Sequence, residues 1–137
     1  MTWRDELSTI AVIASGGAIG ASARWAVATQ LAPSNLDGFP WHTFAVNVLG
    51  CLLIGLASTR IARPSIAWSF ASTGLLGGFT TMSAFAVELN DLAESGAIAT
   101  MLAYLASTLV IGFAVLAVAE AVPGPVDDVA EGPEGIE

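Results

Sequence analysis

A chain of 137 residues that is 55% hydrophobic and only 12% charged is too apolar for an ordinary soluble domain, in which about a quarter of the residues are charged. Four arginines, no lysine and twelve acidic residues give a net charge of −8, so the chain has no basic patch and a nucleic-acid partner is excluded. One cysteine and one histidine exclude an internal disulfide and a zinc cluster.

Four apolar stretches, each close to the length of about 20 residues that crosses a bilayer, follow one another along the chain. We expect spans at residues 9–31, 43–58, 65–89 and 97–122, which form one transmembrane domain over 9–122. Residues 1–8 are an N-terminal segment, and its acids Asp5 and Glu6 argue against a signal peptide, which begins with positive charge. Residues 123–137 are rich in acids, Pro and Gly and are predicted to be a disordered tail.

The first span carries a charge and a small-residue motif. Arg24 either snorkels toward the membrane interface or contributes to the field near a pore, because a charge in hydrocarbon costs several kcal/mol. Four short spans can hardly enclose an aqueous path, so we expect association with a second copy. The GxxxG spacings Gly16–Gly20 and Gly74–Gly78 agree with this expectation, because they allow close approach of helices.

The second span presents polar residues on one helical face. Thr43, Asn47 and Cys51 are spaced at i, i+4 and i+8. The amide of Asn47 can donate a hydrogen bond to an anion. We interpret His42 as a polar residue near the end of the span and Cys51 as a small packed residue.

The third span contains "GLLGGFTTMSAF", in which three glycines and two adjacent threonines weaken a helix. We predict a helix break over Gly77–Thr81, whose freed backbone groups are tolerated only inside protein or beside water. Such carbonyls can replace the hydration of a small cation. After the break, Met82, Phe85 and Glu88 recur at helical spacing beside the hydroxyl of Ser83. An aromatic ring here is usually core, but its positive edge can also face an anion.

The fourth span places hydroxyl groups on one side of a helix, at Thr100, Tyr104, Ser107 and Thr108. Interhelical hydrogen bonding is the first interpretation of these residues.

Taken together, the motifs resemble a known family. "GGFTTMSAF" resembles the GGLTTFSTF-type signature of the Fluc/CrcB fluoride channels. "GGAIGASARW" is similar to that family's G-G-x-x-G-A-x-x-R-[YW], and "WHTFAVNVLGCLLIG" is similar to its G-T-x-x-x-N-x-x-G-x-x-x-x-G. Tyr104 fits as well, and the order and spacing agree over about residues 10–120.

The resemblance implies an all-α membrane protein with four transmembrane helices, the third broken, that pairs as an antiparallel dimer and passes fluoride out of the cell. It implies a structural sodium ion at the dimer centre, held by the backbone carbonyls of Gly77 and Thr80, with Arg24 adding positive potential. The residues that it assigns to the fluoride path are Asn47, Met82, Ser83, Phe85, Glu88, Tyr104, Ser107 and Thr108.

Three residues depart from the family pattern. Phe79, Met82 and Ala84 stand where leucine, phenylalanine and threonine are usual. Methionine loses the ring quadrupole and alanine loses a hydroxyl, so one of the two pores in a dimer is expected to be weakened or lost. A non-conducting assembly subunit of a heterodimeric channel is therefore the main alternative.

Two further classes of membrane protein, a small multidrug transporter and an intramembrane enzyme, are less well supported by the sequence. A small multidrug transporter needs a carboxylate embedded in its first span, and residues 9–31 contain none. An intramembrane enzyme needs a nucleophile–base pair or a metal cluster, which one histidine and one cysteine do not supply.

The arginines also predict an orientation. Arg4, Arg60 and Arg63 lie on the side of the two termini, whereas the loops at 31–42 and 90–96 carry no Lys or Arg. The positive-inside rule then places both termini in the cytoplasm, in the cell's inner membrane. A fixed orientation requires an oppositely oriented partner, so a related subunit is our hypothesis and a homodimer is the alternative.

Overall fold

The computed structural model describes residues 3–31 and 38–125, and the regular structure within these ranges is helical. The first two spans are α1 (Trp3–Leu31) and α2 (Trp41–Arg60). The third span is composite, and the last is α6 (Ile98–Glu120). Among the described residues, four helical stretches are long and apolar enough to cross a membrane, which confirms the predicted four-span architecture. Of the acidic tail predicted over residues 123–137, residues 126–137 lie outside the described residues.

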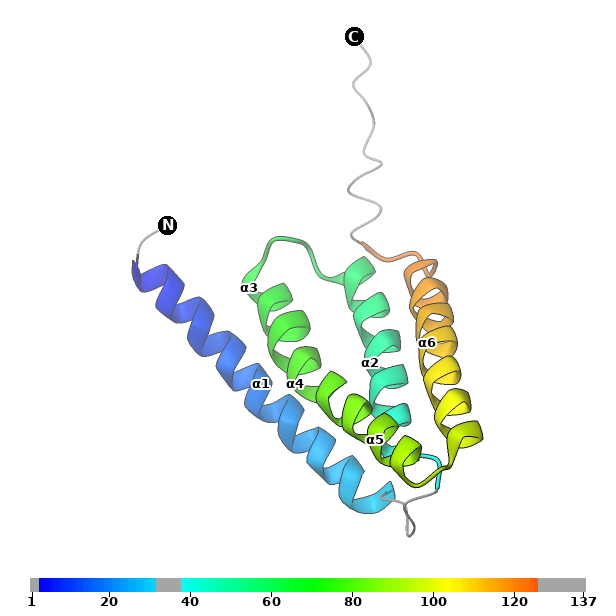
Figure 1. Cartoon of the computed structure of the whole chain (residues 1–137). Helices are drawn as coiled ribbons and strands as arrows, with labels where there is room; N and C mark the ends of the chain where they lie inside the picture. Colours follow the sequence, from blue (N-terminus) through cyan, green and yellow to red (C-terminus); the bar gives the residue numbers. More distant parts are fainter. Residues whose placement is uncertain (1–2, 32–37, 126–137) are drawn as a thin grey trace.

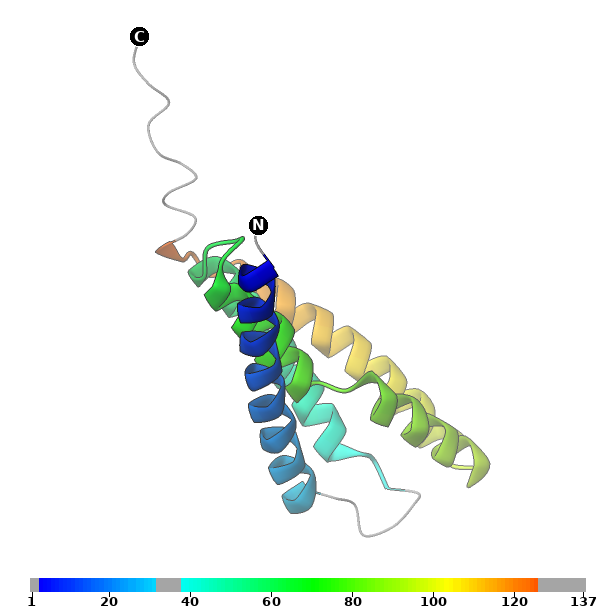
Figure 2. The same cartoon turned by 90° about the vertical axis from the view of Figure 1, so that its left-hand side faces the viewer.

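The third span is not one regular helix, because α-helical and π-helical segments alternate along it and an extended link interrupts it. It comprises α3 (Ile66–Trp68), the π-helical segment η1 (Ser69–Leu76), α4 (Gly77–Phe79) and, after an extended link, α5 (Met82–Glu94). Figure 2 shows this link as the point where the chain leaves one helical axis and continues along another. A broken third helix is thereby confirmed, while the wider turns of η1 were not predicted from the sequence.

The helix ends follow from local capping chemistry. The hydroxyl of Ser65 accepts a hydrogen bond from the Trp68 N–H at 3.0 Å and starts the third span. Gly96 has a φ of 77°, a left-handed conformation that favours glycine, and the Ala97 N–H bonds back to the Leu92 carbonyl at 2.9 Å. This turn reverses the chain and sets α6 beside α5 (Figure 1).

The helices pack in two groups that the broken span joins. Helix α1 packs on η1 and α4, and α2 packs on α6, while α5 departs from α1 and runs beside α6 (Figures 1 and 2). A buried apolar cluster lies toward the α5–α6 turn, at the end of the molecule opposite to the first residues of α1 and the last residues of α6 (Figure 1). Its centre is formed by Phe85, Leu92 and Tyr104.

The two GxxxG motifs face each other within this chain. A Cβ atom at Gly16 would lie 2.8 Å from the Phe70 carbonyl oxygen, and one at Gly20 would overlap the Leu75 carbonyl. A Cβ at Gly78 would likewise overlap the backbone of Gly17. The expectation that these motifs support association with a second copy is therefore wrong, because both are used in the contact between α1 and the third span.

The α1 contact gives a prediction with a matched control. Gly20→Ala places a methyl group against the Leu75 backbone, and we expect it to destabilise the protein by about 1–3 kcal/mol, the usual cost of overpacking. In Gly17→Ala the new methyl group would lie 3.9 Å from the Gly74 carbonyl oxygen, an ordinary van der Waals contact, so this variant is expected to be neutral or slightly stabilising. Thermal unfolding in detergent measures both, and equal stability of the two variants would contradict the packing.

Candidate functional site

The break in the third span is two residues long. Thr80 (φ −74°, ψ 161°) and Thr81 (φ −149°, ψ 118°) are extended, whereas Gly77, Gly78 and Phe79 are still helical. The break is thus narrower than the predicted Gly77–Thr81, and the two threonines rather than the glycines leave the helix. Helix α5 restarts immediately, because the Thr81 hydroxyl accepts a hydrogen bond from the Ala84 N–H at 3.1 Å.

Asn47 pairs with both backbone groups of the second break residue. The Thr81 N–H donates to Asn47 Oδ1 at 2.9 Å, and Asn47 Nδ2 donates to the Thr81 carbonyl at 3.0 Å. These two bonds give the extended backbone the partners that it lacks inside a membrane. In a continuous α-helix the Thr81 N–H would donate to the Gly77 carbonyl. Because this N–H donates to Asn47 instead, the Gly77 carbonyl loses that helical hydrogen bond. We predicted Asn47 as a donor to an anion, and here one of its two amide hydrogens serves the break instead.

Arg24 reaches the first break residue from α1. Its Nη1 donates to the Thr80 carbonyl at 3.3 Å, and the Thr80 hydroxyl donates to the Leu76 carbonyl at 2.9 Å. Gly50 on α2 leaves space for the Thr80 methyl group, which a Cβ at that position would overlap. This contact directs Arg24 toward the break, and its contribution to the field near a pore stays a prediction.

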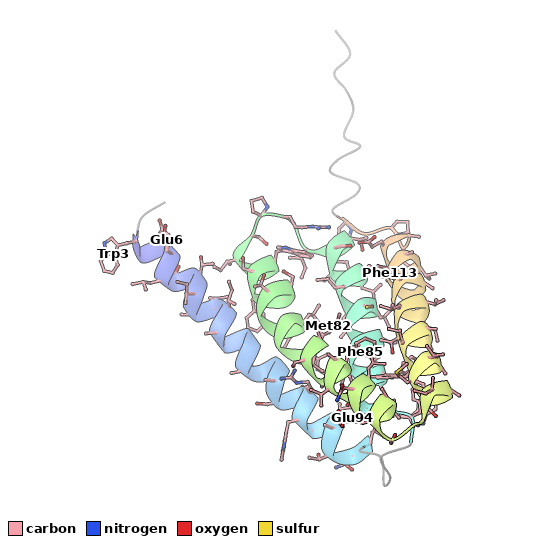
Figure 3. All side chains as sticks on the ribbon, viewed as in Figure 1. Trp3, Glu6, Met82, Phe85, Glu94 and Phe113 are labelled. Carbon is pink, nitrogen blue, oxygen red and sulfur yellow. The ribbon has the colours of Figure 1, made fainter. Side chains whose placement is uncertain are left out.

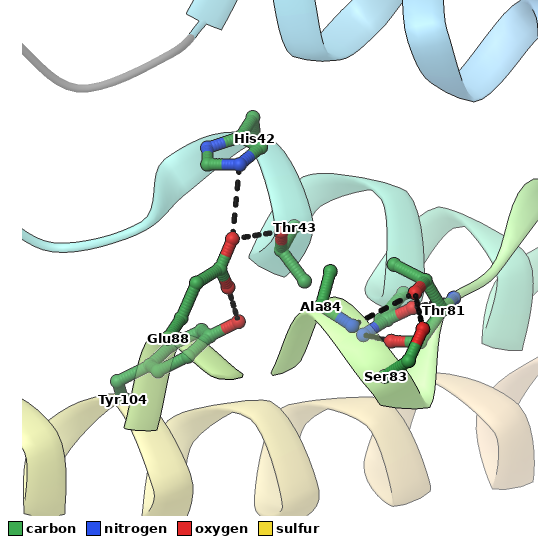
Figure 4. A network of polar contacts seen from close by, with 8 residues as sticks. His42, Thr43, Thr81, Ser83, Ala84, Glu88 and Tyr104 are labelled. Atoms are coloured by element: carbon green, nitrogen blue, oxygen red, sulfur yellow. Dashed lines mark hydrogen bonds and ion pairs between the residues drawn. The ribbon is translucent and has the colours of Figure 1, made fainter. Parts of the chain in front are cut away.

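A second polar cluster surrounds Glu88 on α5 (Figure 4). Thr43 donates to one carboxylate oxygen at 2.6 Å, Tyr104 donates to the other at 2.7 Å, and His42 Nε2 lies 3.0 Å from the first. Glu88 therefore joins α2, α5 and α6. Hydroxyl groups from two neighbouring helices thus supply donors to both oxygens of this carboxyl group.

The side chains at the start of α5 differ sharply in exposure. Met82 is 74% exposed, whereas Phe85, labelled beside it in Figure 3, is 4% exposed. The Phe85 ring lies 4.9 Å from the Tyr104 ring, centroid to centroid, within the apolar cluster. The Ser83 hydroxyl lies 3.3 Å from that of Thr81 and is exposed.

Two hollows flank these residues. A groove of about 440 Å³ runs along α2, the break and α6, and its lining includes Asn47, Gly77, Thr80 and Thr108. A second hollow of about 530 Å³ lies between α1, α2 and α5. The polar residues that line this second hollow are Arg24, His42, Thr43, Thr81 and Ser83. Of the predicted path residues, Asn47, Met82 and Thr108 line the groove and Ser83 lines the second hollow. The other four line neither of them: Phe85, Glu88, Tyr104 and Ser107.

The hydroxyl groups predicted on α6 differ in their hydrogen bonding. Ser107 donates to the Tyr104 carbonyl at 3.3 Å, a local bond within the helix. The hydroxyl of Thr108 is buried and has no hydrogen-bond partner among the described residues. A buried hydroxyl without a partner is costly, so Thr108 is the fourth-span residue best suited to meet a ligand or a second chain in the groove.

Sequence reasoning missed the contact between His42 and Glu88. The two residues lie on consecutive spans, the second and the third, and no local spacing relates them. Within the described residues no group of three or more His, Cys, Asp and Glu side chains is arranged to hold a metal ion.

These features define a class: small helical membrane proteins in which a broken span exposes backbone polar groups at mid-depth, as in many channels and transporters. The chain belongs to the CrcB family, since the family described as "CrcB-like protein, Camphor Resistance (CrcB)" matches residues 11–120. The resemblance inferred from the motifs is confirmed.

Several relatives of this chain are described as channels. It is 45% identical over 116 residues to "Fluoride-specific ion channel FluC 2" of Streptomyces avermitilis, covering 78% of this chain and 70% of that protein. It is 43% identical over 109 residues to "Fluoride-specific ion channel FluC" of Paracoccus denitrificans, covering 77% and 86%. It is 38% identical over 117 residues to the protein of the same description in Prosthecochloris aestuarii, covering 82% and 91%.

Proposed function

We propose that this chain forms a fluoride-specific ion channel that lets fluoride leave the cell passively and so protects the cell from fluoride toxicity. The observation that carries the proposal is the similarity, at 38–45% identity over most of the chain, to proteins described as fluoride-specific ion channels. The four membrane spans and the polar break supply the kind of scaffold that such an activity needs.

The chemistry of the site suits a small, strongly hydrated anion. Removing water from fluoride requires hydrogen-bond donors, and the chain offers the second amide hydrogen of Asn47, the Ser83 hydroxyl and the unpartnered Thr108 hydroxyl. Arg24 adds positive potential at the break. In this proposal Met82, Phe85, Glu88, Tyr104 and Ser107 complete the path.

Phe85 is the side chain whose role is most directly testable. An aromatic edge carries partial positive charge without a net charge, so it can receive a dehydrated anion. Phe85→Ile keeps an apolar side chain in the cluster but removes the ring, and we expect fluoride efflux from loaded liposomes to fall to the level of protein-free vesicles while dimer assembly is largely retained.

Trp3→Ile is the control for loss of an aromatic ring, because Trp3 is 70% exposed at the start of α1 and lies outside the apolar cluster and both hollows. A fluoride electrode follows both variants. Near-normal efflux from Phe85→Ile, or an equal loss in Trp3→Ile, would count against a specific role for the Phe85 ring.

The break also fits a structural sodium ion. The Gly77 carbonyl has lost its helical donor, and the Thr80 carbonyl has two lone pairs of which Arg24 uses one. Both residues line the same groove, and neutral carbonyl oxygens are ligands that suit a small monovalent cation. One chain supplies too few oxygens to replace a hydration shell, so a second copy facing the first would complete the site. When bound, the ion would supply a fixed positive charge between the two chains.

Sodium is therefore expected to stabilise the assembled protein. Its melting temperature in detergent should be higher in sodium chloride than in the chloride salt of a large organic cation, and should rise with sodium concentration. Thr80→Ala keeps the backbone carbonyl and should retain most of this response. Gly50→Ala displaces Thr80 and should lose it. The same melting temperature in both salts would rule out the site.

The assembly that we propose is an antiparallel dimer in the inner membrane. Arg60 and Arg63 lie at the α2–α3 connection, at the same end as the first residues of α1 and the last of α6 (Figure 1). This asymmetry supports cytoplasmic termini and a fixed orientation. Since Met82 and Ala84 depart from the family motif, a related, oppositely oriented subunit would complete one good pore, and a homodimer is the alternative.

Single-cysteine labelling in intact cells separates these assemblies. In a Cys51→Ser background, we expect Ala62→Cys in the α2–α3 connection to react only from the cytoplasm and Ser95→Cys in the α5–α6 turn only from outside. Both positions are exposed. Labelling of each from both sides, together with fluoride efflux by this chain alone, would exclude the heterodimer.

A further inference from the structure

One titratable residue in contact with Glu88, His42, has no assigned part in the proposed path. His42 Nε2 lies 3.0 Å from Glu88 Oε1, with the two side chains 19% and 17% exposed. His42 Nδ1 is buried and has no partner among the described residues, so the carboxylate is the one polar group that these residues offer the ring. The position of the imidazole therefore depends on Glu88 (Figure 4).

The charged and titratable groups around His42 come from three other helices. Glu88 is on α5, Tyr104 on α6 donates to the same carboxylate, and Arg24 on α1 lines the same hollow as His42. The hydroxyl of Thr43 is the remaining donor to Glu88. Counted without Arg24, an ionised Glu88 gives the cluster of His42, Thr43, Glu88 and Tyr104 one negative charge when the imidazole is neutral and a net charge of zero when it is protonated.

We propose that His42 makes fluoride conduction pH-sensitive, because its protonation neutralises the negative charge of Glu88 beside the anion path. The inference rests on the fluoride path proposed above. Histidine is the side chain whose charge normally changes between about pH 5 and pH 8. A negative carboxylate beside the path repels an anion, and a positive imidazole in contact with it cancels this repulsion at short range.

The test combines two measurements on the wild-type protein. The chain contains a single histidine, so the imidazole signals in an NMR spectrum of the purified protein can belong only to His42. Fluoride efflux from liposomes, with equal pH inside and outside, is measured over the same pH range. Protein-free vesicles at each pH give the background, since hydrogen fluoride crosses lipid unaided.

We expect the efflux rate to rise roughly ten-fold as the pH falls from about 8 to about 5, over the interval in which the imidazole titrates. His42→Gln cannot become charged, so its efflux should remain low and independent of pH. His42→Lys carries a positive charge throughout this range, so its efflux should remain high at alkaline pH.

Three results would overturn the inference. Wild-type efflux that is independent of pH while the imidazole titrates would do so without any variant, even if His42→Gln does not fold. A pH dependence that persists in His42→Gln would assign the effect to another group. The absence of fluoride efflux at every pH would refute the proposed function and the inference with it, whereas efflux that is present but constant refutes the inference alone.

Discussion

The pairing of Asn47 with the Thr81 backbone is the interaction on which the rest of the structure depends. A break in a membrane helix survives only if its freed N–H and carbonyl groups find partners. One side-chain amide satisfies both groups of Thr81, and Arg24 satisfies the Thr80 carbonyl. With the break secured in this way, α5 can leave α1 and pack against α6, which brings Glu88 and Phe85 to Tyr104.

The same break explains why polar groups are concentrated in a chain with few charges. Glu88 would be costly as an isolated anion within a span. Two hydroxyl groups and an imidazole surround it, and they come from the helices on either side of α5. Stability and the proposed conduction therefore use the same contacts, since the groups that hold the carboxylate also determine the charge that an anion meets.

The glycines of the two GxxxG motifs make contacts within the chain, so they are not available to a second chain. The packing of α1 on the third span uses all four of them: Gly16, Gly20, Gly74 and Gly78. The groove along α2, the break and α6 remains open, with exposed Met82 and Phe113 and the unpartnered Thr108 hydroxyl in its lining. It is this face, rather than the one marked by the GxxxG motifs, that suits a second chain in the proposed dimer.

The sequence by itself determined the four spans, the interrupted third helix and the family, because apolar length and runs of glycine and threonine act locally along the chain. It also singled out Asn47 and Glu88 as polar residues in a membrane segment. Only the tertiary structure decided their partners: Asn47 with Thr81, Arg24 with Thr80, and His42 with Glu88. It also narrowed the predicted break, Gly77–Thr81, to its last two residues, Thr80 and Thr81. Such contacts join residues more than thirty positions apart, and periodicity within one helix carries no information about which face of another helix it will meet.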